Sequence, residues 1–135
     1  MGLSASVLEE AFPAVKAGVT PLGARVLVQM RLVRTRLESG IVLAKATKDF
    51  NQDIGQMGKI VALGPIAYHN RDTGAAWKEG SWVAVGDYVR VIRYGGDRFR
   101  RKLNEDDHVE FLMLNDYEVY ARVDPEAFEA LDEIK

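Results

Sequence analysis

Short segments with a two-residue apolar period recur along this chain, and they constrain its fold more than any other feature. In the clearest segment, 25–34, the apolar residues are Val26, Val28, Met30 and Leu32. This period places alternate side chains on one face of a β-strand, so the segment predicts a strand with one buried face. Similar or wholly apolar runs occupy 59–63, 88–93, 98–103, 109–114 and 119–123. Short strands with turns at this spacing predict an all-β fold, an antiparallel barrel.

Turn signals between the later runs predict how they connect. Tyr94-Gly95-Gly96-Asp97 supplies a two-residue turn of the primed type, so the runs on either side of it are expected to form an antiparallel hairpin. The last two runs are expected to pair in the same way around Asn115-Asp116. Within the polar segment 65–82, Asp72-Thr73-Gly74 predicts the turn of a protruding hairpin.

The chain's 135 residues are expected to form one domain, spanning 19–123, with a short helix at each end. In the N-terminal extension 1–18, Ser6 stands three residues before Glu9, which is the spacing of a capping box. In the C-terminal tail 124–135, Asp124-Pro125 has the residues favoured at a helix start.

A long segment, 36–57, lacks any sustained period and is expected to be a mobile loop. It is polar except for Ile41-Val42-Leu43, which follows Gly40. Three consecutive large apolar residues are costly to leave in water, by about 1.5 to 3 kcal/mol each. Either this tripeptide pairs with the edge of the barrel as a short strand, or a partner covers it.

No signature of catalysis or metal binding is present. Cysteine is absent and the only histidines are His69 and His108, so we expect neither a metal nor another cofactor. There is no nucleophile elbow and no phosphate-binding glycine loop, and we expect no enzymatic activity.

The overall charge argues against nucleic-acid binding as the main function. The formal net charge is −2 and the isoelectric point is near 5.7. No apolar run is long enough to span a bilayer, and the expected location is the cytoplasm. One basic run, Arg98-Phe99-Arg100-Arg101-Lys102, keeps an alternative open, because an aromatic side chain among arginines can contact nucleic acid.

The order of the motifs resembles that of the chaperonin-10 family, the GroES-like co-chaperonins. The resemblance covers about 19–123, and its five motifs occur in the family's order. They are Pro21-Leu22-Gly23-Ala24-Arg25-Val26-Leu27-Val28, Ser39-Gly40-Ile41-Val42-Leu43, Gly58-Lys59-Ile60-Val61-Ala62-Leu63-Gly64, Val85-Gly86-Asp87-Tyr88-Val89 with Tyr94-Gly95-Gly96, and Asp116-Tyr117-Glu118-Val119-Tyr120-Ala121. The longer loops and the terminal extensions depart from the family pattern, which suggests a divergent member, such as a virus-encoded one.

The resemblance implies a GroES-like β-barrel that forms a heptameric lid on a nucleotide-bound, GroEL-like chaperonin ring and closes a chamber in which an unfolded client protein folds. The lid would dock through mobile-loop residues Gly40, Ile41, Val42 and Leu43. The segment 65–82 would form a roof, with chamber-facing residues Tyr68, Trp77, Trp82 and Tyr94. Subunits would pair the first strand of one chain with the closing strand of the next, through Val26, Val28, Val119, Ala121 and Val123.

A rival hypothesis from another class is a stand-alone β-barrel module that binds nucleic acid or a peptide. Its contact face would consist of Arg31, Arg34, Arg98 and Arg100. The oligomeric state separates the two hypotheses, because a lid requires a ring and a module does not.

Overall fold

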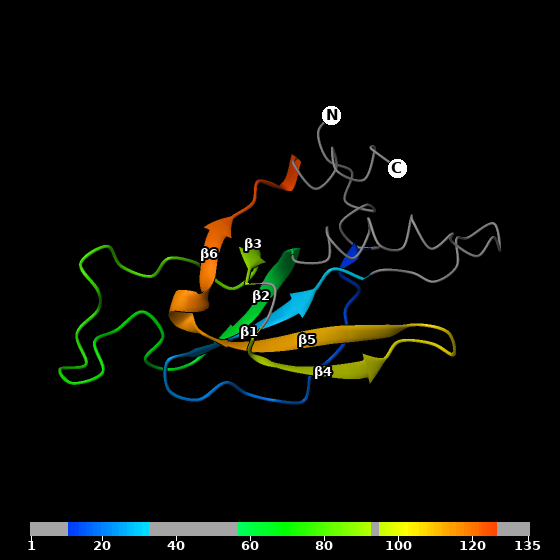
Figure 1. Ribbon diagram of the computed structural model, residues 1–135, viewed down its shortest axis with the longest axis horizontal. Helices are drawn as coiled ribbons and strands as arrows, with labels where there is room; N and C mark the ends of the chain where they lie inside the picture. The colour runs from blue at the N-terminus through cyan, green and yellow to red at the C-terminus, as the bar shows by residue number, and fades with distance from the viewer. Residues whose placement is uncertain (1–10, 33–56, 93–94, 127–135) are drawn as a thin grey trace.

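A computed structural model of the chain describes residues 11–32, 57–92 and 95–126. These residues form one antiparallel sheet of six strands in the order β4-β5-β1-β2-β3-β6 (Figure 1). The strands are β1 (Arg25–Met30), β2 (Met57–Leu63), β3 (Tyr88–Val91), β4 (Asp97–Lys102), β5 (His108–Asn115) and β6 (Val119–Arg122), with a 3-10 helix, η1 (Asp116–Glu118), between β5 and β6. The all-β prediction is confirmed, and the sheet is consistent with a GroES-like barrel.

Two of the predicted hairpins are wrong. β3 pairs with β2 and β6, whereas β4 pairs with β5, so the glycine turn at Gly95-Gly96 joins strands that are not neighbours. β4 is held to β5 by a cross-strand match in which the rings of Phe99 and Phe111 stack 5.5 Å apart. β6 does not pair with β5, because η1 intervenes and the chain then continues beside β3. A local turn signal says nothing about which long-range partner packs best.

The sheet has apolar side chains on both of its faces at β1. Val26, Val28 and Met30 lie in the main core, together with residues of β2, β3, β5 and β6. The alternate residue Leu27 is also buried and packs with Val109 and Phe111 on the opposite face. The prediction of a single buried face for this strand is therefore wrong, and the predicted strand is also too long, because β1 ends at Met30.

The second face of β1 is covered by the chain that precedes it. Residues 11–17, which we call the strap, lie against the sheet (blue in Figure 1). Phe12 is buried, while Val15 and Ala17 pack against Leu27 and its neighbours. At the two ends of the described chain, Ala11, Pro125 and Glu126 are helical, and the rest of both predicted terminal helices lies outside the described residues.

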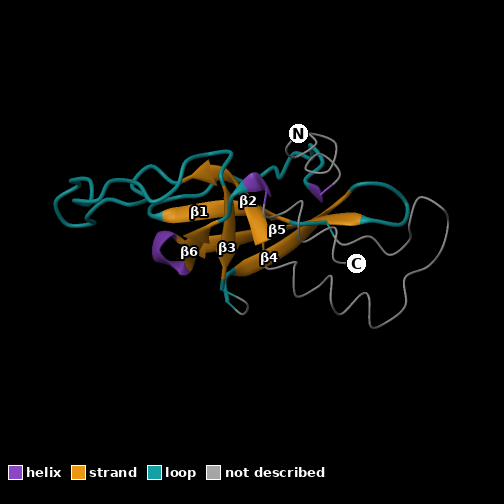
Figure 2. Cartoon of the chain, turned by 90° about the horizontal axis from the view of Figure 1, so that it is seen from above, coloured by secondary structure: helices purple, strands orange, loops and turns teal. Residues whose placement is uncertain are grey.

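The segment 65–82, which we call the arm, projects away from the sheet in both views (Figure 1 and Figure 2). A turn lies where the sequence predicts one: the Asn70 amide donates to the Ala75 carbonyl at 2.7 Å, and Asn70 Oδ1 accepts from the amides of Asp72 and Thr73. A single antiparallel bridge, His69 to Ala76, continues the hairpin toward the sheet.

Candidate functional site

The predicted chaperonin-docking residues, Gly40, Ile41, Val42 and Leu43, lie outside the described residues, as does Tyr94. The structure does describe the two ends of the segment that contains the tripeptide. On one side is Leu32, and on the other is Met57, the first residue of β2. The Arg31 amide donates to the Met57 carbonyl at 3.0 Å, so the chain leaves and rejoins the sheet at one place.

Three aromatic side chains meet where the arm joins the sheet. The ring centroids of Tyr68 and Trp77 are 5.3 Å apart, those of Tyr68 and Trp82 5.4 Å, and those of Trp77 and Trp82 5.2 Å. Edge and tilted contacts at this spacing are favourable for aromatic rings. The cluster fixes the base of the arm on the main core, where both tryptophans are partly buried.

Tyr68 is a buried residue of the main core. Its side chain is 0% exposed, so it has no atom that can face a chamber, and we leave it out of the proposed roof surface. The hydroxyl donates to the Asp116 carbonyl at 2.9 Å, and the Tyr68 amide donates to Asp116 Oδ2 at 2.8 Å. Burial, with a smaller contribution from the Asp116 carboxylate, raises the pKa of Tyr68 to about 12. This pair of bonds, the Tyr68–Asp116 lock, joins the arm to η1.

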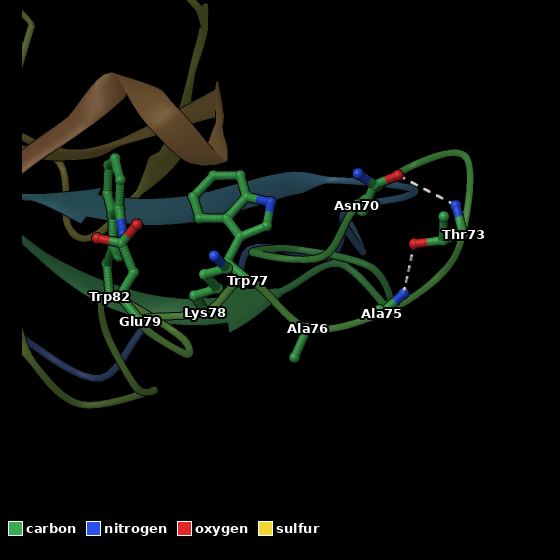
Figure 3. Close-up of a pocket in the computed structure, with 8 residues that line it drawn as sticks. All are labelled: Asn70, Thr73, Ala75, Ala76, Trp77, Lys78, Glu79 and Trp82. Atoms are coloured by element: carbon green, nitrogen blue, oxygen red, sulfur yellow. Dashed lines mark hydrogen bonds between the residues drawn. The ribbon is translucent and has the colours of Figure 1, made fainter.

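The two tryptophans also line hollows on the surface. One hollow, of about 580 Å³, has indole faces beside polar groups (Figure 3), and its lining residues are Asn70, Thr73, Ala75, Ala76, Trp77, Lys78, Glu79 and Trp82. A second, of about 440 Å³, lies between Trp82 and β6. Trp82 Nε1 is buried and has no hydrogen-bond partner. Both hollows combine apolar area with polar groups.

The predicted subunit-interface residues fall into two groups. Val26, Val28 and Val119 belong to the main core, whereas Ala121 and Val123 are half-buried. β1 has β2 on one edge and β5 on the other. This corrects the expectation for the first strand, because both edges of β1 are paired and its residues 26–30 are buried, which leaves only Arg25 exposed.

The open edges of the described sheet belong to β4 and β6. The Val123 amide donates to the Tyr88 carbonyl of the β3 side at 2.7 Å. Because successive amides along a regular strand point to opposite edges, the Arg122 amide points away from β3, whereas the bulge in the β3–β6 register at Tyr120 interrupts this alternation. β6 therefore presents backbone donors and acceptors along its outer side.

Exposed apolar side chains lie in two places that matter for assembly. Tyr117 and Tyr120, 63% and 56% exposed, project from η1 and β6. Val19 and Leu22, 41% and 69% exposed, lie on the segment that leads into β1. Asp116 and the two tyrosines fall within the turn and the closing-strand motif that the sequence indicates, but no role was predicted for their side chains. Their signal was an aromatic residue at an exposed position of the closing strand and a carboxylate at its preceding turn.

The arginines of the rival hypothesis do not form one free face. Arg98 Nη1 is 3.0 Å from Glu110 Oε1, in an ion pair. Arg101, from the same basic run, donates to the Ala17 carbonyl and lies over the Phe99 ring. Burial lowers the pKa of Arg31, and Arg34 lies outside the described residues.

Among the residues that the structure describes, no three acidic, histidine or cysteine side chains are grouped to hold a metal ion. Within the same residues, no helix has the length and apolar character needed to cross a bilayer. His69 is engaged locally, with Nδ1 2.9 Å from the Ala67 carbonyl.

Comparison with known proteins agrees with this architecture. The profile of the family described as the chaperonin 10 kDa subunit matches residues 18–123, which is most of the chain and includes every described strand. A search of curated proteins found no match for the sequence. The chain belongs to the chaperonin-10 family, the GroES-like co-chaperonins.

Proposed function

We propose that this protein is a heptameric lid for a GroEL-like chaperonin ring in its nucleotide-bound state, and that it closes the chamber in which an unfolded client protein folds. The observation that carries the proposal is the family match over residues 18–123, on a sheet with one open, tyrosine-bearing edge. The lid has no catalytic activity of its own and works in the cytoplasm.

Assembly uses the outer edge of β6. An unpaired strand edge with exposed aromatic side chains is a template for another chain, and a second strand beside it would satisfy the outward amide of Arg122. The complementary surface on the neighbour is the segment that carries Val19 and Leu22. Contact between two different patches is head-to-tail, and such contacts close into a ring when the rotation between subunits permits.

Docking uses Ile41-Val42-Leu43, preceded by Gly40, in a predicted mobile loop. One such loop binds weakly, because ordering the backbone costs about 1 to 2 kcal/mol per residue. Seven loops on one ring bind together, since each docked loop raises the effective concentration of the next.

The arm forms the roof of the chamber. Trp77 and Trp82 are its client-facing residues, because each is partly exposed and lines a hollow that combines apolar and polar groups. Their role is to present a shallow surface over which a client chain moves without tight binding.

The experiment combines light scattering after size exclusion with capping of a GroEL-like chaperonin ring in the presence of ADP. We expect a mass near seven times 15.1 kDa and nucleotide-dependent association. Ile41→Ser should leave the ring intact and abolish association. A monodisperse monomer at micromolar concentration would refute the lid and favour the stand-alone binding module.

A further inference from the structure

The strap lies entirely before the family match, which begins at residue 18. It is nevertheless an integral part of the packed structure. Its backbone carbonyls accept three hydrogen bonds from the sheet: Ala11 from the Leu32 amide at 2.9 Å, Pro13 from Gln29 Nε2 at 2.7 Å, and Ala17 from Arg101 Nε at 2.8 Å.

The first part of the strap contacts the described residues on either side of the segment that carries the docking tripeptide. Ala11 and Phe12 form a buried cluster with Met57, to which Tyr88 and Val123 also contribute. The Phe12 ring lies 5.3 Å from the Tyr88 ring, at an interplanar angle of 47°. The hydrogen bond from Leu32 to Ala11 holds the residue where the described chain stops before the segment, and the contact with Met57 holds the residue where it resumes.

Gln29 is a buried polar residue of β1 whose hydrogen-bond partner is in the strap. It is 4% exposed, in the middle of β1 on the face that packs with Phe111, where an apolar residue would ordinarily stand. A buried amide is costly without a partner, and the Pro13 carbonyl supplies one. A polar residue at this position is explained by the strap that covers it.

We propose that the strap is a positioning element for chaperonin docking, with Phe12 as its main positioning residue. By holding Leu32 through the Ala11 carbonyl and Met57 through the cluster around Phe12, it sets the place and separation of the two ends of the docking segment on every subunit. Fixed ends reduce the number of arrangements that a tethered contact must give up on binding. This inference rests on the proposed function, and it adds a role for residues outside the family match.

The experiment compares Phe12→Ala with Val109→Ala in the full-length protein. Val109 is also buried, in the cluster around Leu27 and Phe111 that the far end of the strap covers, and this cluster includes neither Leu32 nor Met57. For each variant we would measure amide exchange at Leu32, oligomeric mass, thermal stability, and affinity for a GroEL-like chaperonin ring with ADP, at a temperature well below both melting points.

We expect Phe12→Ala to keep the oligomeric mass, to lose at least about tenfold of the protection at the Leu32 amide, and to weaken chaperonin affinity at least about tenfold because the defect is repeated in every subunit. Val109→Ala should retain both properties, and Phe12→Leu should restore most of the affinity. Where Phe12→Ala does not fold, Phe12→Val makes a smaller truncation at the same contact.

Three results would overturn the proposal. One is wild-type affinity in Phe12→Ala, and another is an equal loss of affinity in Val109→Ala, which would mean that general stability is responsible. The third is unchanged Leu32 exchange in Phe12→Ala. Failure of the wild-type protein to associate with the chaperonin would instead refute the proposed function and remove this role with it, while the exchange data would still report whether the strap anchors Leu32.

Discussion

The Tyr68–Asp116 lock gives the sharpest test of how the arm is held, and the perturbation we choose is Asp116→Ala. Asp116 is 4% exposed and Tyr68 is 0% exposed, so water does not readily replace either partner. The substitution removes the carboxylate that accepts the Tyr68 amide at 2.8 Å, and it leaves the two backbone bonds of Asp116, from its amide and to its carbonyl, unchanged.

The expected magnitude follows from the bond that is lost. A buried amide left without an acceptor costs about 1 to 3 kcal/mol. Tyr68 also has a φ of +63°, a backbone conformation that side-chain-bearing residues keep only when their surroundings enforce it. Without the carboxylate the arm can relax from this conformation and recover part of the loss. We therefore expect the free energy of unfolding to fall by about 2 kcal/mol.

Two further substitutions separate the components of the lock. Asp116→Asn keeps a side-chain oxygen but not its charge, and should lose roughly half as much, since hydrogen bonds to charged groups are the stronger kind. Tyr68→Phe removes only the hydroxyl bond to the Asp116 carbonyl, and should lose about 0.5 to 1.5 kcal/mol.

The assay is urea denaturation at pH 7 and at one fixed protein concentration, because assembly adds to apparent stability. Amide exchange at Trp77, whose amide donates to the Tyr68 carbonyl, reports on the arm separately. A loss of less than about 0.5 kcal/mol in Asp116→Ala, or an equal loss in Asp116→Asn, would refute the reasoning that a charged acceptor holds Tyr68 in place.

The structure makes two further predictions. First, folding raises the pKa of Tyr68 to about 12 from an ordinary value near 10. The contribution of the neutral Tyr68 hydroxyl to stability is therefore complete below pH 10 and is lost as the pH rises toward 12. Urea denaturation across that range should show a smaller decline in the free energy of unfolding for Tyr68→Phe than for the wild type. Second, Arg122→Pro removes an outward-pointing amide and should leave each subunit folded but prevent assembly, whereas Ala121→Pro removes an amide that faces β3 and should destabilise the subunit. Circular dichroism reports folding and light scattering reports assembly. A heptamer of Arg122→Pro would contradict the assignment of β6 as the assembly edge.

Periodicity and turn residues predicted the strands well but their partners poorly. The alternation around Val26 and Val28 is local, so it located β1 to within a few residues. It could not reveal that Leu27 on the other face is also buried, because the covering strap belongs to a different part of the chain. Pairing of β4 with β5 has a local signal that the prediction overlooked, the turn in which Asn104 Oδ1 accepts from the amides of Asp106 and Asp107.

The candidate site could be predicted only as far as the family resemblance carried it. The resemblance named the tryptophans of the arm as roof residues, and both line surface hollows, while their contact with a client stays a prediction. Tyr68 belongs to the same segment and the same residue class, yet it is a core residue. What distinguishes it is Asp116, 48 residues away, and only the folded chain brings the two together.

The two edges that are open in the described sheet differ in a way that bears on how subunits would meet. β4 is lined by charged side chains, among them Arg98, Arg100 and Lys102, and charged edges resist the addition of another strand. β6 presents Tyr120 beside outward backbone groups, with Tyr117 at its start, and aromatic side chains favour contact with a second chain. The charge on β4 disfavours joining two copies through that edge, and in the contact that we propose β6 meets a different surface on the next subunit, the segment that carries Val19 and Leu22, and not a second β6. That asymmetry is the condition for head-to-tail growth, and a head-to-tail contact that closes produces a ring.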